Sequence, residues 1–257
     1  RNLKERGSKT AIIWEPNDPS EPSIHLTYQE LYEETCKFSN ALRLKGIKKG
    51  DRVIIYMPMV PEAAIAMLAC ARVGAVHSVV FAGFSSTSLA DRINDCQAKM
   101  VLTSDGNFRG NKTIPVKSVV DEALEKSSTI ESVIVLERTK QTINMFEGRD
   151  HWWHDCIKAE SNICEAEVLD SEDMLFILYT SGLTGKPKGV MLSHNNITSN
   201  ALDASERLPS LGKDTRILSF LPICHIFERV LIYIYQYAGT SIYFAEGIDK
   251  IGENAKE

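Results

Sequence analysis

The sequence predicts an α/β protein with mostly parallel sheets and helices on both faces. Short apolar runs of strand length alternate with longer segments of helical periodicity, and Gly, Pro and Ser/Thr residues mark many boundaries between them. Such a β-α-β rhythm is typical of a parallel sheet covered by helices. At 257 residues, with 44% apolar and 25% charged residues, the chain can form one large domain or two ordinary ones.

The first part of the chain contains seven expected elements. Residues 61–74 are predicted to form a helix that begins at Pro61, which suits a first helical turn, and ends at Gly74. Residues 85–97 are predicted to form a helix with Ser and Thr in its cap region. The other expected elements are a helix over 116–127 and strands over 52–57, 76–81, 99–104 and 132–137.

The rhythm restarts after Asp170, beyond an irregular segment over 140–170. We expect this segment to join a first subdomain, about 1–139, to the start of a second, about 171–257. The elements expected in the second part are strands over 174–180, 189–193, 216–222 and 240–246, with helices over 194–208 and 226–239.

Charge and composition exclude several classes of function. The net charge is −5 with both signs interspersed, so neither a nucleic-acid face nor a polycation partner is indicated. The apolar run 63–71 is too short to span a bilayer, and the charged N-terminus lacks an apolar signal region. Six scattered cysteines indicate a reducing, cytoplasmic compartment. His151, His154 and Cys156 lie close together, but no second ligand pair has zinc-site spacing, so we assign no metal ligand.

The run "YTSGLTGKPKGV" (179–190) is unusually rich in residues that suit a phosphate. Its glycines allow sharp turns and a close approach of the backbone, its hydroxyls and lysines suit an anion, and successive N–H groups can form an anion nest. The run is not a Walker loop, because Gly182 and Gly185 are too close together and Pro187 follows the lysine. A polar β-hairpin turn is the alternative interpretation.

The same run resembles the phosphate-binding signature of the adenylate-forming enzymes, which include acyl-CoA synthetases, peptide-synthetase adenylation domains and luciferases. Further likeness lies in "GDRVIIYMPMVPEAAIAMLACARVGAVHSVVFAGFS", "EGRDHWW" and "EDMLFILYTSG". From about 10 to 190 the chain is similar to acetyl-CoA synthetases. From about 191 to 257, "SFLPICHIFERV" and "YAGTSIYFAEGIDKIGENAKE" resemble long-chain fatty acyl-CoA synthetases. A natural divergent sequence and a chimera are both compatible with this mixture.

The resemblance implies specific residues for ATP and for the acyl site. The signature implies that the phosphates of ATP meet Thr180, Ser181, Gly182, Leu183, Thr184, Gly185, Lys186 and Lys188. Among these, Leu183 departs from the pattern, which usually has Ser or Thr there. His225 and Phe227 would line the acyl and pantetheine pocket, although a buried or helix-capping role for His225 is the alternative. Glu228 and Arg229 can form a solvated pair in the first helix turn, and we assign them no role.

The resemblance also implies a site for CoA. "FRGNKTIP" (108–115) is similar to the acetyl-CoA synthetase segment that holds the nucleotide part of CoA, so Arg109 and Lys112 would meet the 3′-phosphate. The planar fork of arginine suits a phosphate, whereas lysine meets it as a point charge. An ordinary exposed basic turn is the alternative interpretation.

The reaction implied by the resemblance joins a carboxylate to CoA and converts ATP to AMP and pyrophosphate, with acetate as the expected acid. Long-chain fatty acid–CoA ligation and non-catalytic nucleotide or CoA binding are the alternatives. ATP, Mg²⁺ and CoA are the implied cofactors and cosubstrates. The family's Tyr-Gly-x-Thr-Glu segment and its lysine-bearing C-terminal domain do not occur before Glu257, so we expect residues 1–257 to be part of the large N-terminal domain and weakly active or inactive alone.

Overall fold

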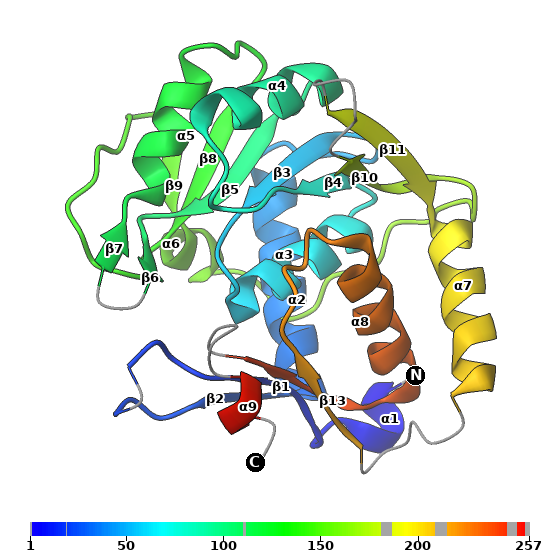
Figure 1. Cartoon of the computed structure of the whole chain (residues 1–257). Coiled ribbons are helices and arrows are strands. Elements are labelled where there is room, and N and C mark those ends of the chain that lie inside the picture. The colour runs from blue at the N-terminus through cyan, green and yellow to red at the C-terminus, as the bar shows by residue number, and fades with distance from the viewer. Residues whose placement is uncertain are drawn as a thin grey trace.

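Two sheets of mostly parallel strands organise the fold (Figure 1). A computed structural model describes residues 2–18, 20–109, 112–180, 187–208, 215–245 and 251–254. The larger sheet has its seven described strands in the order β11-β10-β4-β3-β5-β8-β9, and β11 alone among them runs antiparallel to its neighbour. These strands are β3 (Arg52–Tyr56), β4 (Val76–Val79), β5 (Met100–Ser104), β8 (Ser132–Leu136), β9 (Asp150–Trp152), β10 (Met174–Thr180) and β11 (Lys188–Ser193).

The smaller sheet brings the two ends of the described chain together. Its order is β12-β13-β1-β2, with β12, β13 and β1 parallel and β2 antiparallel. The strands are β1 (Thr10–Trp14), β2 (Ile24–Thr27), β12 (Arg216–Ser219) and β13 (Ser241–Phe244). A separate hairpin pairs β6 (Asn107–Arg109) with β7 (Lys112–Ile114).

Helices cover both faces of the larger sheet (Figure 1). On its outer face lie α4 (Ser86–Cys96) and α5 (Val116–Leu124), and between the two sheets lie α2 (Tyr28–Leu44) and α3 (Pro61–Arg72). α7 (His194–Arg207) packs beside α8 (Ile226–Ala238). The short helices are α1 (Asn2–Arg6), α6 (Trp153–Ile157) and α9 (Ile251–Asn254). No helix among the described residues is both long and apolar enough to cross a membrane.

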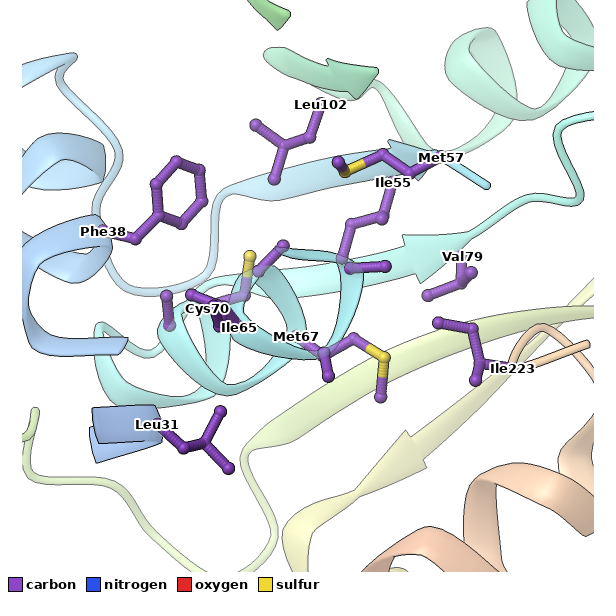
Figure 2. Packing of buried hydrophobic residues seen from close by; sticks show 14 of the residues in the cluster. Leu31, Phe38, Ile55, Met57, Ile65, Met67, Cys70, Val79, Leu102 and Ile223 are labelled. Atoms are coloured by element: carbon purple, nitrogen blue, oxygen red, sulfur yellow. The ribbon is translucent and has the colours of Figure 1, made fainter. Parts of the chain in front are cut away.

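The central strands are buried on both faces because apolar side chains occupy successive positions. In β3, Val53 and Ile55 point into the core between the sheets, whereas Ile54 and Tyr56 point toward α4 and α5. Successive strand side chains alternate between faces, so one apolar run serves two cores. Figure 2 shows the inner core around α3, where Met67 and Cys70 face the strands.

The predicted fold class is confirmed, and all thirteen expected elements exist with ends shifted by a few residues. The segment 140–170, expected to be irregular, contains β9 and α6. Two contacts hold them: the buried Lys117 ammonium lies 2.7 Å from Asp150, and Trp153 stacks on Phe38 at 3.7 Å between ring centroids. The division into two subdomains stays a prediction. β10 and β11 lie in the same sheet as β3, β4, β5 and β8, and β1 pairs with β13.

Candidate functional site

A cavity of about 430 Å³ lies where the carboxyl ends of both sheets meet. In open α/β sheets, ligands bind in the crevice outside the carboxyl ends of the strands. This cavity is lined by residues that follow β1, β3, β4, β8, β12 and β13 and by the β6–β7 hairpin beyond β5. Its wall is mostly apolar and includes Trp14, Met57, Met59, Val79, Val80, Phe81, Phe108, Ile114, Ile223 and Cys224, with Glu15, Arg109 and Arg138 as charged groups.

The β6–β7 hairpin is anchored at its base by the fully buried carboxylate of Asp105. This carboxylate accepts hydrogen bonds from the backbone N–H groups of Gly106 at 2.6 Å, Arg138 at 2.9 Å and Thr139 at 3.0 Å. Backbone donors satisfy a buried carboxylate without another charged side chain. The anchor therefore joins the start of the hairpin to the chain that follows β8.

Arg138 supports the hairpin from the cavity side. Its guanidinium lies 5.2 Å from the ring centre of Trp14 and 5.6 Å from that of Phe108, and its Nε–H donates to Asn107 Oδ1 at 3.2 Å. Burial lowers the pKa of Arg138, and the nearby Glu62 and Asp105 carboxylates oppose that shift. Stacking on two aromatic faces suits a planar guanidinium. The contact links the smaller sheet, which carries Trp14, to the hairpin.

The two residues expected to meet CoA lie together on this hairpin. Arg109 and Lys112 are register partners of β6 and β7, and both side chains are exposed. Arg109 also lines the cavity. Two adjacent cations beside a cavity can receive a phosphate group.

The glycine-rich segment, residues 180–188, leaves the larger sheet at the same edge. Thr180 ends β10 and Lys188 begins β11, and they are register partners. Because β10 runs parallel to β4, Thr180 lies at the carboxyl edge. The other residues expected to meet ATP lie outside the described residues, namely Ser181, Gly182, Leu183, Thr184, Gly185 and Lys186.

The buried guanidinium of Arg229 supports the part of the cavity wall that contains Ile223. Arg229 Nε–H donates to the Ile223 carbonyl at 3.1 Å, and its Nη1 lies 2.8 Å from His77 Nε2 on β4. Burial and the neighbouring Arg229 charge place the pKa of His77 well below its usual range, so its neutral ring can accept this hydrogen bond. Figure 2 shows Ile223 beside Val79 of β4, and both line the cavity.

The solvated Glu228–Arg229 pair that the sequence allowed does not form. Both side chains are buried, with exposed fractions of 3% and 0%, and they bond to different partners. The Ser219 hydroxyl donates to Glu228, whereas Arg229 also stacks on Phe176 at 4.8 Å. Their position in a first helix turn indicated exposure, but this turn of α8 contacts β12 of the smaller sheet and β4 and β10 of the larger sheet. The sequence pattern of α8 alone does not show that both sheets cover its first turn.

His225 and Phe227 stand beside the cavity and are not part of its lining. His225 is the N-cap of α8, and its Nδ1 accepts a hydrogen bond from the Phe227 N–H at 3.3 Å. Phe227 is 59% exposed. Their neighbours Ile223 and Cys224 supply the wall instead. This geometry agrees with the alternative interpretation of His225, which was a helix-capping residue.

Sequence reasoning missed the segments that follow β3 and β4. Met57, Met59 and the run 79–83 line the cavity directly after their strands end. Residues 80–81 were expected to continue β4, yet they leave the sheet and form the wall. The general position of ligands beyond carboxyl strand ends is the signal that could have identified them.

Known proteins resemble this chain in sequence. The family of AMP-binding enzymes matches residues 1–255. An acetyl-coenzyme A synthetase of Bdellovibrio bacteriovorus is 56% identical over 191 residues, which cover 74% of this chain and 30% of that protein. Acetyl-coenzyme A synthetase 2 of Pseudomonas aeruginosa is 55% identical over 191 residues, with the same two shares. The chain thus spans less than a third of the length of these curated relatives.

The fold comparison agrees with the sequence comparison. The structure of an acetoacetyl-CoA synthetase from Streptomyces lividans superposes with a TM-score of 0.86 at 25% identity, covering 95% of this chain and 37% of that one. The two acetyl-coenzyme A synthetases agree with the expected likeness to that branch of the adenylate-forming enzymes. The chain belongs to the family of AMP-binding enzymes.

Proposed function

We propose that this chain forms the ATP- and CoA-binding part of an AMP-forming acetate–CoA ligase. One observation carries the proposal: the ends of the glycine-rich segment and the basic β6–β7 hairpin stand at the carboxyl edge of the larger sheet, where the cavity also opens. A phosphate-binding run, a pair of cations and an apolar cavity at one edge suit a nucleotide, a charged cosubstrate and its neutral arm.

The reaction has two steps. An oxygen of the carboxylate attacks the α-phosphorus of ATP, a P–O bond forms, and pyrophosphate leaves with the electron pair of the broken bond. The sulfur of CoA then attacks the acyl carbon of the adenylate and a C–S bond forms. The bond between that carbon and the phosphate oxygen breaks, AMP leaves with its electron pair, and the thiol proton passes to solvent. Lys188 at the end of the glycine-rich segment can hold negative charge that grows on the leaving pyrophosphate.

CoA would contact both the β6–β7 hairpin and the cavity. Arg109 and Lys112 would hold the 3′-phosphate, since they are adjacent, exposed cations. The largely apolar wall around Met57, Val80 and Ile223 suits the uncharged pantetheine arm. Arg138 and Asp105 hold the hairpin in place and do not themselves need to contact CoA.

The family's use of ATP implies Mg²⁺ as the metal of the reaction. The described part of the chain contains no group of three or more His, Cys, Asp or Glu side chains that could hold a metal ion. Mg²⁺ prefers several oxygen ligands in octahedral geometry. Among the described residues we therefore assign no ligand to Mg²⁺ and no step to the metal.

Calorimetric titration of the chain with CoA and with 3′-dephospho-CoA tests the CoA site. We expect CoA to bind about tenfold more tightly, because only CoA carries the phosphate that Arg109 and Lys112 can meet. Equal affinities would remove these residues from the proposal. A separate titration with ATP tests the glycine-rich segment.

ATP–pyrophosphate exchange tests the acid, and acetate is expected because the similar proteins are named acetyl-coenzyme A synthetases. Acetate, octanoate and palmitate are compared in the chain and in a protein that extends it to the length of those relatives. We expect exchange with acetate in the longer protein and little or none in the chain alone. Exchange with palmitate but not acetate would contradict the proposed substrate.

A further inference from the structure

Tyr179, the last residue but one of β10, is held by helix α4. Its hydroxyl donates to Asp95 Oδ2 at 2.7 Å and lies 3.4 Å from the Arg92 carbonyl oxygen. The Arg92 guanidinium lies 5.4 Å from the centre of the Tyr179 ring and 4.9 Å from that of Phe84. Arg92 is 6% exposed, so this cation packs between two aromatic rings. The contact joins the end of β10 to a helix on the outer face of the sheet.

The position of the Tyr179 ring also accounts for the glycine at position 189, which lies opposite it. Tyr179 and Gly189 are register partners in the β10–β11 hairpin. A Cβ atom at Gly189 would lie 3.2 Å from Tyr179 Cε1 and 2.9 Å from Ile177 Cγ2. The second distance is one that real Cβ atoms essentially never show. The two side chains of β10 thus occupy the space above Gly189, and β11 lies close against them.

These contacts act at the two points where the glycine-rich segment departs. Thr180 follows Tyr179, Lys188 precedes Gly189, and Thr180 pairs with Lys188. Movement of the Tyr179–Gly189 pair would therefore move both ends of the segment together. A phosphate site gains affinity when its donors are held in place before the ligand arrives.

We propose that Tyr179, Asp95 and Arg92 form a clamp that fixes the stem of the glycine-rich segment, which makes Tyr179 a positioning residue for phosphate binding. The inference rests on the proposed function, in which this segment meets the phosphates of ATP. Asp95 is exposed, and the hydrogen bond that it accepts lies at the surface. Surface polar contacts contribute little to global stability, so its effect should be local.

Amide hydrogen exchange tests the clamp without any ligand. Tyr179→Phe removes the hydroxyl and keeps the ring, and we expect the amides of residues 188–191 to exchange about threefold to tenfold faster. Asp95→Ala should have the same effect, whereas Asp95→Asn keeps an acceptor oxygen and should match the parent protein. The double variant Tyr179→Phe/Asp95→Ala should exchange no faster than either single variant.

Tyr28→Phe is the matched control. The Tyr28 hydroxyl donates to the Thr240 carbonyl oxygen at 2.9 Å, and this hydrogen bond joins α2 to the residue before β13 of the smaller sheet, whereas Tyr179 lies in the larger sheet. This variant should leave exchange at 188–191 unchanged. If Tyr179→Phe also leaves that exchange unchanged, or if Asp95→Asn behaves like Asp95→Ala, the clamp is refuted.

Titration with ATP and with pyrophosphate then connects the clamp to binding. We expect Tyr179→Phe and Asp95→Ala to weaken both affinities about threefold to tenfold, with Asp95→Asn and Tyr28→Phe near the parent value. Faster exchange at 188–191 with unchanged affinities would overturn the positioning role. Failure of the parent chain to bind either ligand, together with the expected exchange changes, would overturn the phosphate role of the segment and leave the clamp as a structural finding.

Discussion

Leu183 is the one position in the glycine-rich segment that departs from the signature it resembles. A hydroxyl there could donate a charge-assisted hydrogen bond to a phosphate, which is worth about 1.5–3 kcal/mol. We predict that Leu183→Ser tightens ATP binding about tenfold or more, as measured by calorimetry. Leu183→Ala is the control, because it removes the bulk without adding a donor. Equal dissociation constants for the parent and the serine variant would contradict this account.

Asp150 is a buried carboxylate whose ionisation affects acid stability. Its side chain is fully buried and contacts Lys117 at 2.7 Å and Arg149 at 2.6 Å. Burial alone would raise the pKa of Asp150, but the hydrogen bonds from Arg149 and Lys117 outweigh it and the pKa is lowered. A lowered folded-state pKa means that the carboxylate stabilises the fold above about pH 4 and loses that effect as the pH falls further.

We therefore predict that Asp150→Asn lowers the free energy of unfolding by about 3 kcal/mol at pH 7, because it leaves Lys117 buried without its full partner. The variant should also lose less stability than the parent between pH 5 and pH 3, in urea titrations at each pH. Asp155→Asn, at a side chain that is 63% exposed, is the matched control. A parent and variant with parallel pH profiles would contradict the role of Asp150.

The hairpin β6–β7 is the element that carries the proposed CoA contacts. We predict that Arg109→Ala weakens CoA binding about tenfold and leaves 3′-dephospho-CoA binding unchanged, and that Lys112→Ala has a smaller effect of the same kind. Lys126→Ala, at an exposed cation on the chain after α5, is the control in the same calorimetric titration. An equal loss for both ligands in Arg109→Ala would indicate a role other than phosphate recognition.

Helix α2 shows how a local signal fixes an element. Thr27 and Glu30 form a reciprocal capping box, with the Thr27 hydroxyl oxygen accepting from the Glu30 N–H at 3.1 Å and the Glu30 carboxylate accepting from the Thr27 N–H at 2.8 Å. We predict that Thr27→Ala lowers the free energy of unfolding by about 1 kcal/mol in urea titration. Glu33→Ala, within the same helix, is the control, and an equal loss in both variants would count against the cap.

Many elements with strong local patterns were predicted, but α2 was missed despite its capping box, as were β1 and β2. The alternation in β3 and the Pro61 and Gly74 boundaries of α3 are visible in the sequence and agree with the structure. The hairpin β6–β7 and the short β9 were not expected. Both depend on buried groups from elsewhere in the chain, Asp105 with the chain after β8 and Lys117 with Asp150.

At the scale of the whole molecule, the site depends on pairings that no local pattern specifies. β1 pairs with β13, so that Ile12 lies beside Ile242, and this pairing places Trp14 against Arg138 at the cavity. Signature residues could be identified from the sequence, but the cavity wall after β3 and β4 could not. A strand pattern alone does not show where its carboxyl end meets a second sheet.

Above all, we propose that the carboxyl edge shared by the two sheets binds ATP and CoA. Amide hydrogen exchange of the chain with and without each ligand tests it most directly. We expect ATP to slow exchange near Thr180 and Lys188, and CoA to slow exchange over residues 107–114 and 222–224. Protection confined to the opposite edge, around Lys49 and Asp173, or no protection by either ligand, would contradict it.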